Sequence, residues 1–391
     1  MSHKLISLNP DLKRLRDDGY DVDVRAGHLV VRDVPYVTTN REVKRGILAS
    51  TLELTGDRTT RPGTHVAMFS DTPCHADGKV LTEIINQSSA VSIEPGLTMA
   101  HSFSSKPATG YADYYEKMTT YIRILTSEAH VLEPSVSAQT HPVLVDDLDG
   151  SLFHYLDTAS SRSQITSLTG KLQNDTIAIV GLGGTGSYVL DLIAKAPVRA
   201  IHLFDGDDFL QHNAFRTPGA ASITDLQSKS KKVNYLTGIY TRMHRHIVPH
   251  PYFLNASNVD ELKEASFAFV CIDRGAVKRV VIEKLTELGI SYVDVGMGLY
   301  VMGDQVHGVL RTTTSTPAMR AHIQDTVSFA DVGDDDAYRT NIQVADLNAL
   351  NAALAVIKWK KHRGFYGDTE HEHSSLYVLG GNVLINEDRV K

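Results

Sequence analysis

The chain has 391 residues and carries 39 Lys and Arg against 46 Asp and Glu, a formal net charge of −7 at pH 7. This acidic balance argues against a nucleic-acid binder, which needs a basic surface to neutralise phosphates. No apolar run approaches the ~18 residues of a membrane-spanning helix, and residues 1–15 lack the apolar core of a signal peptide. We therefore expect a cytoplasmic protein without a membrane partner.

Residues 1–150 are predicted to form an α+β domain. The segments 28–37 (HLVVRDVPYV) and 64–70 (THVAMFS) have the composition of strands, whereas 113–129 (DYYEKMTTYIRILTSEA) has helical periodicity. The domain boundary is expected within 140–155, where Pro, Gly and acidic residues cluster. A second domain of ordinary size then occupies residues 151–391.

Residues 176–186, TIAIVGLGGTG, change from an apolar run into a glycine-rich turn that precedes a helix-compatible segment. The four glycines are Gly181, Gly183, Gly184 and Gly186. Glycines at this spacing let the backbone turn tightly from strand to helix and approach a phosphate, while the helix amino terminus supplies N–H donors. The sequence therefore predicts a nucleotide site here, because a strand, a turn and a helix follow one another in the required order.

A second short strand ends in two acids, Asp205 and Asp207, about twenty residues after the glycine turn. A carboxylate at this place can accept hydrogen bonds from the ribose hydroxyls of a nucleotide. These features alone also suit an NAD-dependent oxidoreductase, which stays an alternative.

Further polar side chains follow in a fixed order: Asn213, Arg216, the cluster Lys229, Lys231 and Lys232, and, after an apolar strand, Asp273. Hydride transfer needs no Arg, Lys and metal-binding acid to neutralise phosphates. Adenylation does, because the attack of a carboxylate on an α-phosphate builds negative charge that Arg, Lys and Mg²⁺ stabilise. An ordinary solvated basic face is the alternative for the lysines.

The three segments together resemble the ThiF/MoeB/ubiquitin-activating-enzyme superfamily over residues 155–360. The matching segments are GLGGTGS at 181–187, LFDGDDFLQHNAFR at 203–216 and CID at 271–273. The resemblance implies a Rossmann-like, ThiF-type α/β adenylation domain over 151–391. It also implies a function: adenylation of the C-terminal glycine carboxylate of a ubiquitin-like protein with ATP and Mg²⁺.

The resemblance also implies roles for single residues. Asp207 would hold the ribose, and Asn213 and Arg216 would contact the phosphates. Lys232 matches the family lysine that opens a helix, although the neighbouring Lys231 stays an alternative.

Asp273 matches the Mg²⁺ ligand of the family. Capping of the following helix is the other explanation for an acid at that position. The family usually has Asn directly after this Asp, and Arg274 stands there in this chain, so the contact made at that position is open.

Arg162 lies in 151–165, where the superfamily often has a helix whose arginine reaches the ATP of a partner subunit. This role would require a homodimer. The alternative is a surface arginine on a linker helix.

The chain has two cysteines, Cys74 and Cys271. No CxxC pairs exist, so the structural zinc of many ThiF-type enzymes is not expected, and 311–340, where thioester-forming relatives carry their cysteine, has none. Cys271 is predicted to be a core residue, whereas Cys74, beside His75 in a turn-rich segment, is a candidate reactive thiol.

Without a cysteine in 311–340, the adenylate would pass directly to an acceptor or to a hydroxyl group of Thr312–Thr316. His322 or Asp325 would act as the base for that hydroxyl group. The alternative for Thr312–Thr316 is a flexible Ser/Thr loop.

The segments 41–54 and 64–78 resemble an amino-terminal domain fused to ThiF-type enzymes in bacterial operons that encode ubiquitin-like proteins. We interpret residues 1–150 as a docking domain for a partner or substrate, and a conjugating enzyme is a possible further partner. A non-catalytic scaffold subunit of a heterodimeric activating enzyme is the remaining alternative.

The last predicted element is a helix within 338–364 that ends near Lys360, Lys361 and Gly364. Its apolar face is expected to comprise Ile342, Ala345, Leu347, Leu350, Ala353, Leu354, Ile357 and Trp359.

Overall fold

The computed structural model describes residues 2–146, 150–329 and 342–389. Residues 330–340, which belong to the cysteine-free segment 311–340, lie outside the described residues. The chain divides into two compact units, Met1–Leu144 and Val145–Lys391, which are described separately. Within the described residues, no helix combines the length and apolar character needed to cross a membrane.

The first unit is a six-stranded antiparallel sheet with the strand order β1-β2-β3-β6-β8-β7. Its strands are β1 (Asp21–Arg25), β2 (His28–Val37), β3 (Val43–Thr51), β6 (Val66–Phe69), β7 (Ile85–Glu94) and β8 (Leu97–Ser104), and β4 (Leu54–Thr55) pairs with β5 (Arg58–Thr59). Its helices are α1 (Ser2–Leu8), α2 (Pro10–Asp17) and α3 (Tyr114–Leu132). The predicted strands at 28–37 and 64–70 and the predicted helix at 113–129 are confirmed.

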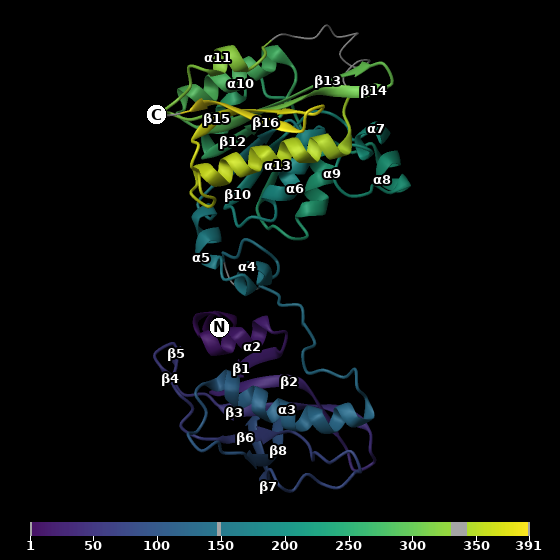
Figure 1. The fold of residues 1–391 in the computed structure, drawn as a ribbon, viewed down its shortest axis with the longest axis vertical. Helices are drawn as coiled ribbons and strands as arrows, with labels where there is room; N and C mark the ends of the chain where they lie inside the picture. Colours follow the sequence, from purple (N-terminus) through teal and green to yellow (C-terminus); the bar gives the residue numbers. More distant parts are fainter. Residues whose placement is uncertain (1, 147–149, 330–341, 390–391) are drawn as a thin grey trace. The chain divides into compact units, whose positions relative to one another are not determined.

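Helix α3 lies along one face of this sheet (Figure 1). It begins where the side chain of Asp113 accepts a hydrogen bond from the amide of Glu116, an N-cap that satisfies a free N–H of the first turn. Its buried side chains, among them Met118 and Leu125, join the strand residues in one hydrophobic core.

The second unit is built on an eight-stranded sheet with the order β11-β10-β9-β12-β13-β14-β15-β16. The first five strands are parallel to one another and the last three are added antiparallel. The strands are β9 (Thr176–Val180), β10 (Ala200–Phe204), β11 (Ile247–His250), β12 (Phe267–Val270), β13 (Ser291–Met302), β14 (Gln305–Ser315), β15 (Glu372–Val378) and β16 (Val383–Arg389). This order of the parallel strands is that of a Rossmann-like sheet, so the predicted fold class is confirmed.

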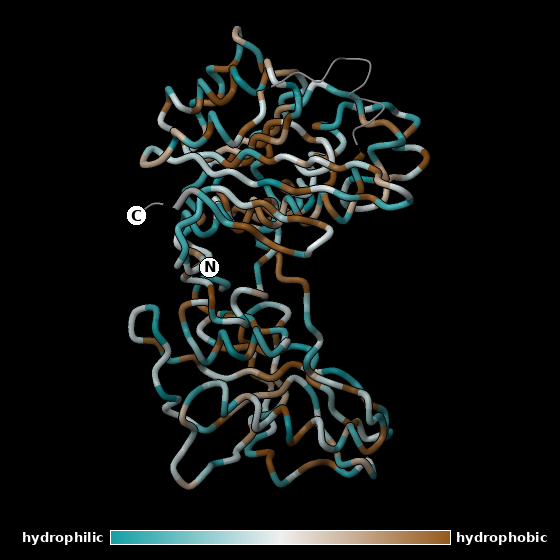
Figure 2. Tube along the Cα trace, turned by 45° about the horizontal axis from the view of Figure 1, so that its top comes forward, coloured by the Kyte–Doolittle hydropathy of each residue, from teal (hydrophilic) through white to brown (hydrophobic). Residues whose placement is uncertain are grey.

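Helices cover both faces of this sheet (Figure 1). They are α4 (Thr158–Arg162), α5 (Thr166–Thr169), η1 (Gly170–Leu172), α6 (Gly184–Ile193), α7 (Gln211–Ala214), α8 (Ile223–Ser228), α9 (Lys232–Tyr240), η2 (Val259–Glu264), α10 (Gly275–Glu287), α11 (Ile323–Thr326) and α13 (Ala345–His362). Helices α6, α9 and α13 share one core with the sheet, and α10, α11 and η2 share the other. Hydrophobic segments, brown in Figure 2, run through the strands between these two layers.

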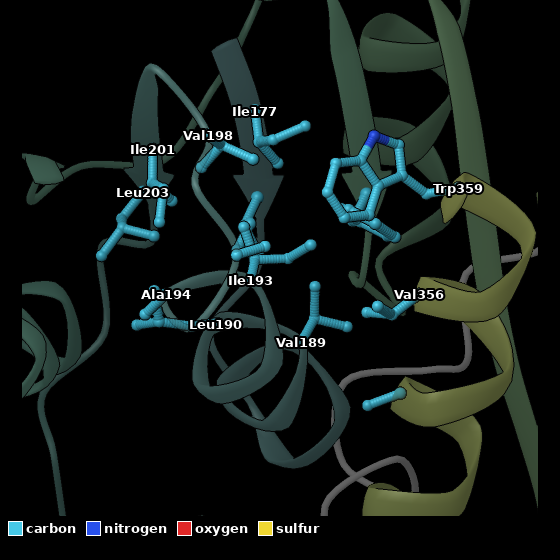
Figure 3. Close-up of a cluster of buried hydrophobic side chains, with 14 of the residues drawn as sticks. Ile177, Val189, Leu190, Ile193, Ala194, Val198, Ile201, Leu203, Val356 and Trp359 are labelled. Atoms are coloured by element: carbon cyan, nitrogen blue, oxygen red, sulfur yellow. The ribbon is translucent and has the colours of Figure 1, made fainter. Parts of the chain in front are cut away.

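The core on the α6 side includes Trp359 of α13, which is fully buried and lies near Val189 and Ile193 of α6 (Figure 3). Its indole N–H donates to Asp175 Oδ2 at 2.9 Å. The same carboxylate accepts hydrogen bonds from Arg363 and Ser266. A buried carboxylate with three donors therefore joins the end of α13 to the residue before β9.

The predicted helix within 338–364 is present as α13, but its buried face differs from the expected one. Ile342 precedes the helix, and Ile357 is 40% exposed. The buried face instead comprises Leu347, Asn348, Asn351, Ala352, Ala355, Val356, Lys358 and Trp359. Apolar periodicity missed this face because it contains two asparagines and a lysine that find polar partners inside the unit.

The run Thr312–Thr316 is not a flexible loop, so this alternative is wrong. Residues 312–315 are the last residues of β14, and Thr312 and Ser315 are at most 1% exposed. Threonine suits a pleated, buried strand because it is β-branched.

Lys117 of α3 is fully buried in the first unit. Its Nζ donates to Ser50 Oγ at 2.7 Å and to the carbonyl oxygen of Thr64 at 2.9 Å. Burial lowers the pKa of this ammonium to about 8, since its charged form loses hydration.

We expect Lys117 to make the first unit more stable as the pH rises from 8 to about 10.5. In this window the folded state has released the proton of Lys117 and the unfolded state has kept it, so the cost of burying the charge disappears. Below pH 8 both states are charged and the cost is complete. Urea midpoints measured by circular dichroism should rise over this window in the wild type.

The Lys117→Met variant should lose this increment, whereas Lys106→Met, at an exposed position of the same unit, should keep it. Equal pH dependence of the urea midpoint in all three proteins would show that Lys117 is not the titrating group.

Candidate functional site

The glycine turn between β9 and α6 lies at the carboxyl end of the central strand, where the strand order reverses direction. Gly181 has φ +91°, and a Cβ there would lie 2.6 Å from the carbonyl oxygen of Cys271. A Cβ on Gly186 would lie 1.9 Å from the carbonyl oxygen of Gly181. Both positions therefore require glycine, and α6 begins against the ends of β9 and β12.

Asn348 of α13 also meets this turn, and the sequence did not indicate it. A Cβ on Gly184 would lie 2.2 Å from Asn348 Nδ2, and the hydroxyl of Thr185 donates to Asn348 Oδ1 at 2.9 Å. Asn348 is 1% exposed. The first turn of α13 thus fixes the start of α6 through a buried amide; an asparagine within an otherwise apolar helix was the only sequence signal.

Asp205 directly follows β10, and both of its carboxylate oxygens accept hydrogen bonds from backbone amides. Oδ2 accepts the amide of Leu182 in the glycine turn at 2.7 Å, and Oδ1 accepts the amide of Asp207 at 2.8 Å. Asp205 is 6% exposed, and burial raises the pKa of its carboxyl group against the opposing effects of Lys232 and these amides. Asp205 therefore holds two loops together, which leaves Asp207 as the acid with an accessible side chain.

Lys232 is the first residue of α9, as predicted, and its Nζ lies 2.7 Å from Asp207 Oδ2 and 3.9 Å from Asp205 Oδ2. The Lys232 side chain is 8% exposed and that of Asp207 is 38% exposed. Lys231 is different: its Nζ bonds to the carbonyl oxygen of Gly206 and pairs with Asp208. Of the two candidate lysines, Lys232 is the one beside the predicted ribose acid.

Asn213 lies in the short helix α7 and is 1% exposed. Its Oδ1 accepts the amide of Leu210 at 2.8 Å, whereas its Nδ2 is buried without a hydrogen-bond partner. Arg216 is half-buried just beyond α7. Burial lowers the pKa of His212, and the positive charges of Arg216 and Lys232 lower it further.

Asp273 is exposed on the loop that follows β12, at the same edge of the sheet as the glycine turn. The N-cap of the following helix α10 is Arg274, with no side-chain cap. An exposed carboxylate at this edge suits Mg²⁺, which proteins commonly hold through one or two carboxylates together with substrate phosphates. In the described part of the chain, no group of three or more His, Cys, Asp or Glu could hold a metal ion by itself.

Arg162 is the last residue of α4 and is exposed. It precedes β9 in the chain, and the contacts that join the glycine turn, Asp205, Asp207 and Lys232 do not include it. Its role at a partner's site stays a prediction.

Both cysteines are poorly placed to act as nucleophiles. Cys74 is 1% exposed, and its backbone forms isolated β-bridges with Val37 and Val80 in the first unit. Burial raises the pKa of its thiol. Burial also raises the pKa of Cys271, with a further contribution from Asp294. Since the thiolate is the reactive form, neither side chain has the environment of an activated cysteine.

Comparison with known proteins gives two family matches. Residues 161–355 match the model of the ThiF family, and residues 10–158 match that of a domain of unknown function, DUF6791. Ubiquitin-like modifier-activating enzyme 5 of Culex quinquefasciatus and that of Aedes aegypti are each 23% identical over 150 residues, which is 36% of this chain and 38% of the relative. The matched region thus spans well under half the length of these relatives.

Solved structures similar to the chain include a crystal structure of PaaA, with 16% identity and a TM-score of 0.44 over 57% of this chain and 76% of that chain. They also include a crystal structure of E. coli MccB with ATP, with 16% identity and a TM-score of 0.45 over 60% of this chain and 70% of that chain.

We expect Asp205→Ala to destabilise the second unit by about 2 kcal/mol or more, because it leaves the amides of Leu182 and Asp207 without their acceptor. Urea unfolding followed by the fluorescence of Trp359, the single tryptophan, measures the effect. Asp208→Ala is the matched control: its exposed pair with Lys231 should contribute less than about 1 kcal/mol. Equal loss in the two variants would contradict the role assigned to Asp205.

Proposed function

Residues 161–355 of this chain belong to the ThiF family, and from this premise we propose that the chain adenylates the C-terminal glycine carboxylate of a ubiquitin-like protein. The observation that carries the proposal is the ion pair of Lys232 with Asp207, held beside the glycine turn. With Lys232 on a phosphate and Asp207 on the ribose, this pair would supply a cation and an acid beside a helix amino terminus, a set of groups suited to ATP.

Different residues of the chain would bind different parts of the nucleotide. The amides of the glycine turn and the amino end of α6 would bind phosphate oxygens. Asp207 would accept hydrogen bonds from the ribose, and Asn213 Nδ2, a buried donor without a partner, would bond to a phosphate together with Arg216. Asp273 would hold Mg²⁺ with the phosphates, and Mg²⁺ would supply charge neutralisation of the pyrophosphate that leaves.

The reaction needs no proton transfer. One oxygen of the glycine carboxylate attacks the α-phosphorus, the bond between the α-phosphorus and the bridging oxygen breaks, and pyrophosphate leaves with that electron pair. The negative charge that develops on the transferred group is stabilised by Lys232 and Arg216, which are positioned before the substrate arrives. Lys232 would exchange its bond to Asp207 for bonds to phosphate, while Asp207 turns to the ribose.

The choice of a ubiquitin-like protein as the substrate rests on motifs and relatives. The motif segments 181–187, 203–216 and 271–273 resemble activating enzymes, and two relatives are named ubiquitin-like modifier-activating enzyme 5. The first unit would dock the substrate protein or a conjugating enzyme. Arg162 would act at the ATP of a partner subunit, which makes a homodimer the expected active form.

The activated carboxylate would leave without a thioester on this chain. Both thiols have raised pKa values, and the hydroxyl groups of Thr312 and Ser315 are buried in β14. Direct transfer of the acyl group from the adenylate to an acceptor on another protein is therefore the route that the described residues favour.

ATP–pyrophosphate exchange in the presence of the ubiquitin-like protein tests the function. The wild type should catalyse exchange, whereas an oxidoreductase or a non-catalytic scaffold subunit should not. We expect Lys232→Ala and Asp273→Ala to lower the exchange rate by at least ~100-fold, as the loss of a charge-stabilising group at a reacting phosphate does.

Lys231→Ala is the matched control for Lys232→Ala. Because Lys231 Nζ binds Gly206 and Asp208, its loss should lower the exchange rate by less than ~5-fold. Exchange above a few per cent of wild type in folded Asp273→Ala would remove that carboxylate from the reaction, and a larger effect at Lys231 than at Lys232 would reverse the assignment.

We further expect the Cys74→Ser, Cys271→Ser double variant to retain both exchange and onward transfer. Adenylation requires charge stabilisation and an aligned carboxylate, and neither thiol supplies them. Activity per folded protein corrects for the packing that is lost at Cys271. A covalent adduct with the ubiquitin-like protein that thiol reductant cleaves and that this variant lacks would contradict the proposed route.

A further inference from the structure

A cavity of about 690 Å³ lies in the second unit, lined by residues from the carboxyl end of α13, from the end of β14 and from the start of β15. This volume falls in the range of small-molecule sites, roughly 300–1,000 Å³. All three segments contribute polar side chains to the lining, among them Thr314, Thr316, Lys358, Lys361, Glu372 and His373.

The cavity is separate from the candidate nucleotide site. Thr314 pairs with Val293, near the first residue of β13, so the cavity lies at the amino edge of the parallel strands. The glycine turn lies at their carboxyl edge. Along α13, Lys358 at the cavity is about 15 Å from Asn348 at the glycine turn, at the helical rise of 1.5 Å per residue.

The two carboxylates of the lining already have partners. Lys361 Nζ donates to Glu372 Oε1 and Oε2, each at 3.0 Å, and lies 3.3 Å from Asp368 Oδ1. The same oxygen of Asp368 accepts the amide of His371 at 3.1 Å. Among the residues that the structure describes, no cluster of three or more His, Cys, Asp or Glu could hold a metal ion. The lining therefore does not suit a metal cation.

Lys358, in contrast, is buried with long contacts. Its side chain is 5% exposed, and its Nζ lies 3.3 Å from the carbonyl oxygen of Glu372 and 3.4 Å from Glu372 Oε1. Ordinary N–H···O hydrogen bonds measure roughly 2.7–3.2 Å. Burial lowers the pKa of this ammonium group, because its charged form loses hydration. A further acceptor next to Lys358 Nζ would stabilise its charge.

Thr314 supplies a second donor at the cavity. It is 6% exposed, and its hydroxyl oxygen is buried without a hydrogen-bond partner in the described part of the chain. Two residues on, Thr316 Oγ1 lies 3.4 Å from His373 Nε2, which is also a long contact. A buried hydroxyl group without a partner costs free energy. The polar groups that remain available at this cavity are therefore donors rather than carboxylates.

We propose that this cavity binds a small molecule through an oxyanion group, a phosphate or a carboxylate, that accepts hydrogen bonds from Lys358 Nζ and Thr314 Oγ1. An oxyanion has several acceptor lone pairs and a negative charge, and charge-assisted hydrogen bonds of this kind are the strong ones. The cavity is much larger than the ~30 Å³ that one water molecule occupies, so the ligand has room for further groups beside the oxyanion. Adenylation as proposed above makes no use of this site.

Isothermal titration of the full-length chain with inorganic phosphate, citrate and glycerol, at constant ionic strength, tests the proposal. The wild type should bind phosphate or citrate but not uncharged glycerol. Phosphate binding would indicate a phosphate-bearing ligand, and citrate binding a carboxylate-bearing one. We expect Lys358→Met to weaken the anion at least ~tenfold and Thr314→Val, which keeps the shape but lacks the hydroxyl group, to weaken it ~fivefold.

Lys360→Met is the matched control on the same helix. Lys360 does not line the cavity, and its Nζ lies over the ring of Phe365, 4.9 Å from the centroid, so the variant should keep the anion affinity. Because phosphate can also bind at the glycine turn, Lys232→Ala separates the two sites, and anion binding at the cavity should survive this change.

Four results would overturn the proposal: no binding of either anion to the wild type, wild-type affinity in Lys358→Met, wild-type affinity in Thr314→Val, or loss of all anion binding in Lys232→Ala. Circular dichroism shows whether each variant is folded. If Lys358→Met does not fold, Thr314→Val decides. Pyrophosphate exchange tests the proposed function independently, so the failure of one proposal is distinguishable from the failure of the other.

Discussion

The candidate site depends on one steric constraint, the contact of the glycine turn with its own backbone. The carbonyl oxygen of Gly181 occupies the space that a Cβ on Gly186 would need, and the carbonyl oxygen of Cys271 occupies that of a Cβ on Gly181. With no side chains at these points, α6 starts directly against β9 and β12. The free N–H groups of its first turn then point past the carboxyl ends of the strands, where the loops that carry Asp207 and Asp273 also lie.

The charges at this edge are arranged in two layers. The buried carboxylate of Asp205 is satisfied by two backbone amides and does not depend on a ligand. The more exposed Asp207 is paired with Lys232 and can exchange this partner. An acid and a cation that bind each other are ordered before a ligand arrives, so a nucleotide that binds them would replace one charge-assisted bond with two and order few additional groups.

The sequence predicts those parts of the site that depend on neighbouring residues and misses those that depend on contacts between distant segments. The glycine turn, the acids after β10 and the helix that begins at Lys232 are local patterns, and the structure has them as expected. Asn348 could not be predicted, because its partners Gly184 and Thr185 lie more than 160 residues earlier in the chain. The buried face of α13 was misjudged for the same reason: hydropathy scores each residue alone, whereas burial of an asparagine or a lysine depends on partners from distant segments.

The run Thr312–Thr316 and Cys74 show how burial determines whether a hydroxyl or thiol group can react, which composition alone leaves open. A Ser/Thr run suggests either a loop or a nucleophile, but a pleated strand that is covered on both faces buries the hydroxyl groups and holds them away from an incoming acyl group. Burial acts on Cys74 electrostatically as well, because it disfavours the thiolate. The carboxyl edge of the sheet, in contrast, keeps the side chains of Asp207 and Asp273 accessible on loops. Among the described residues, chemistry is therefore expected at the ends of the strands rather than along them.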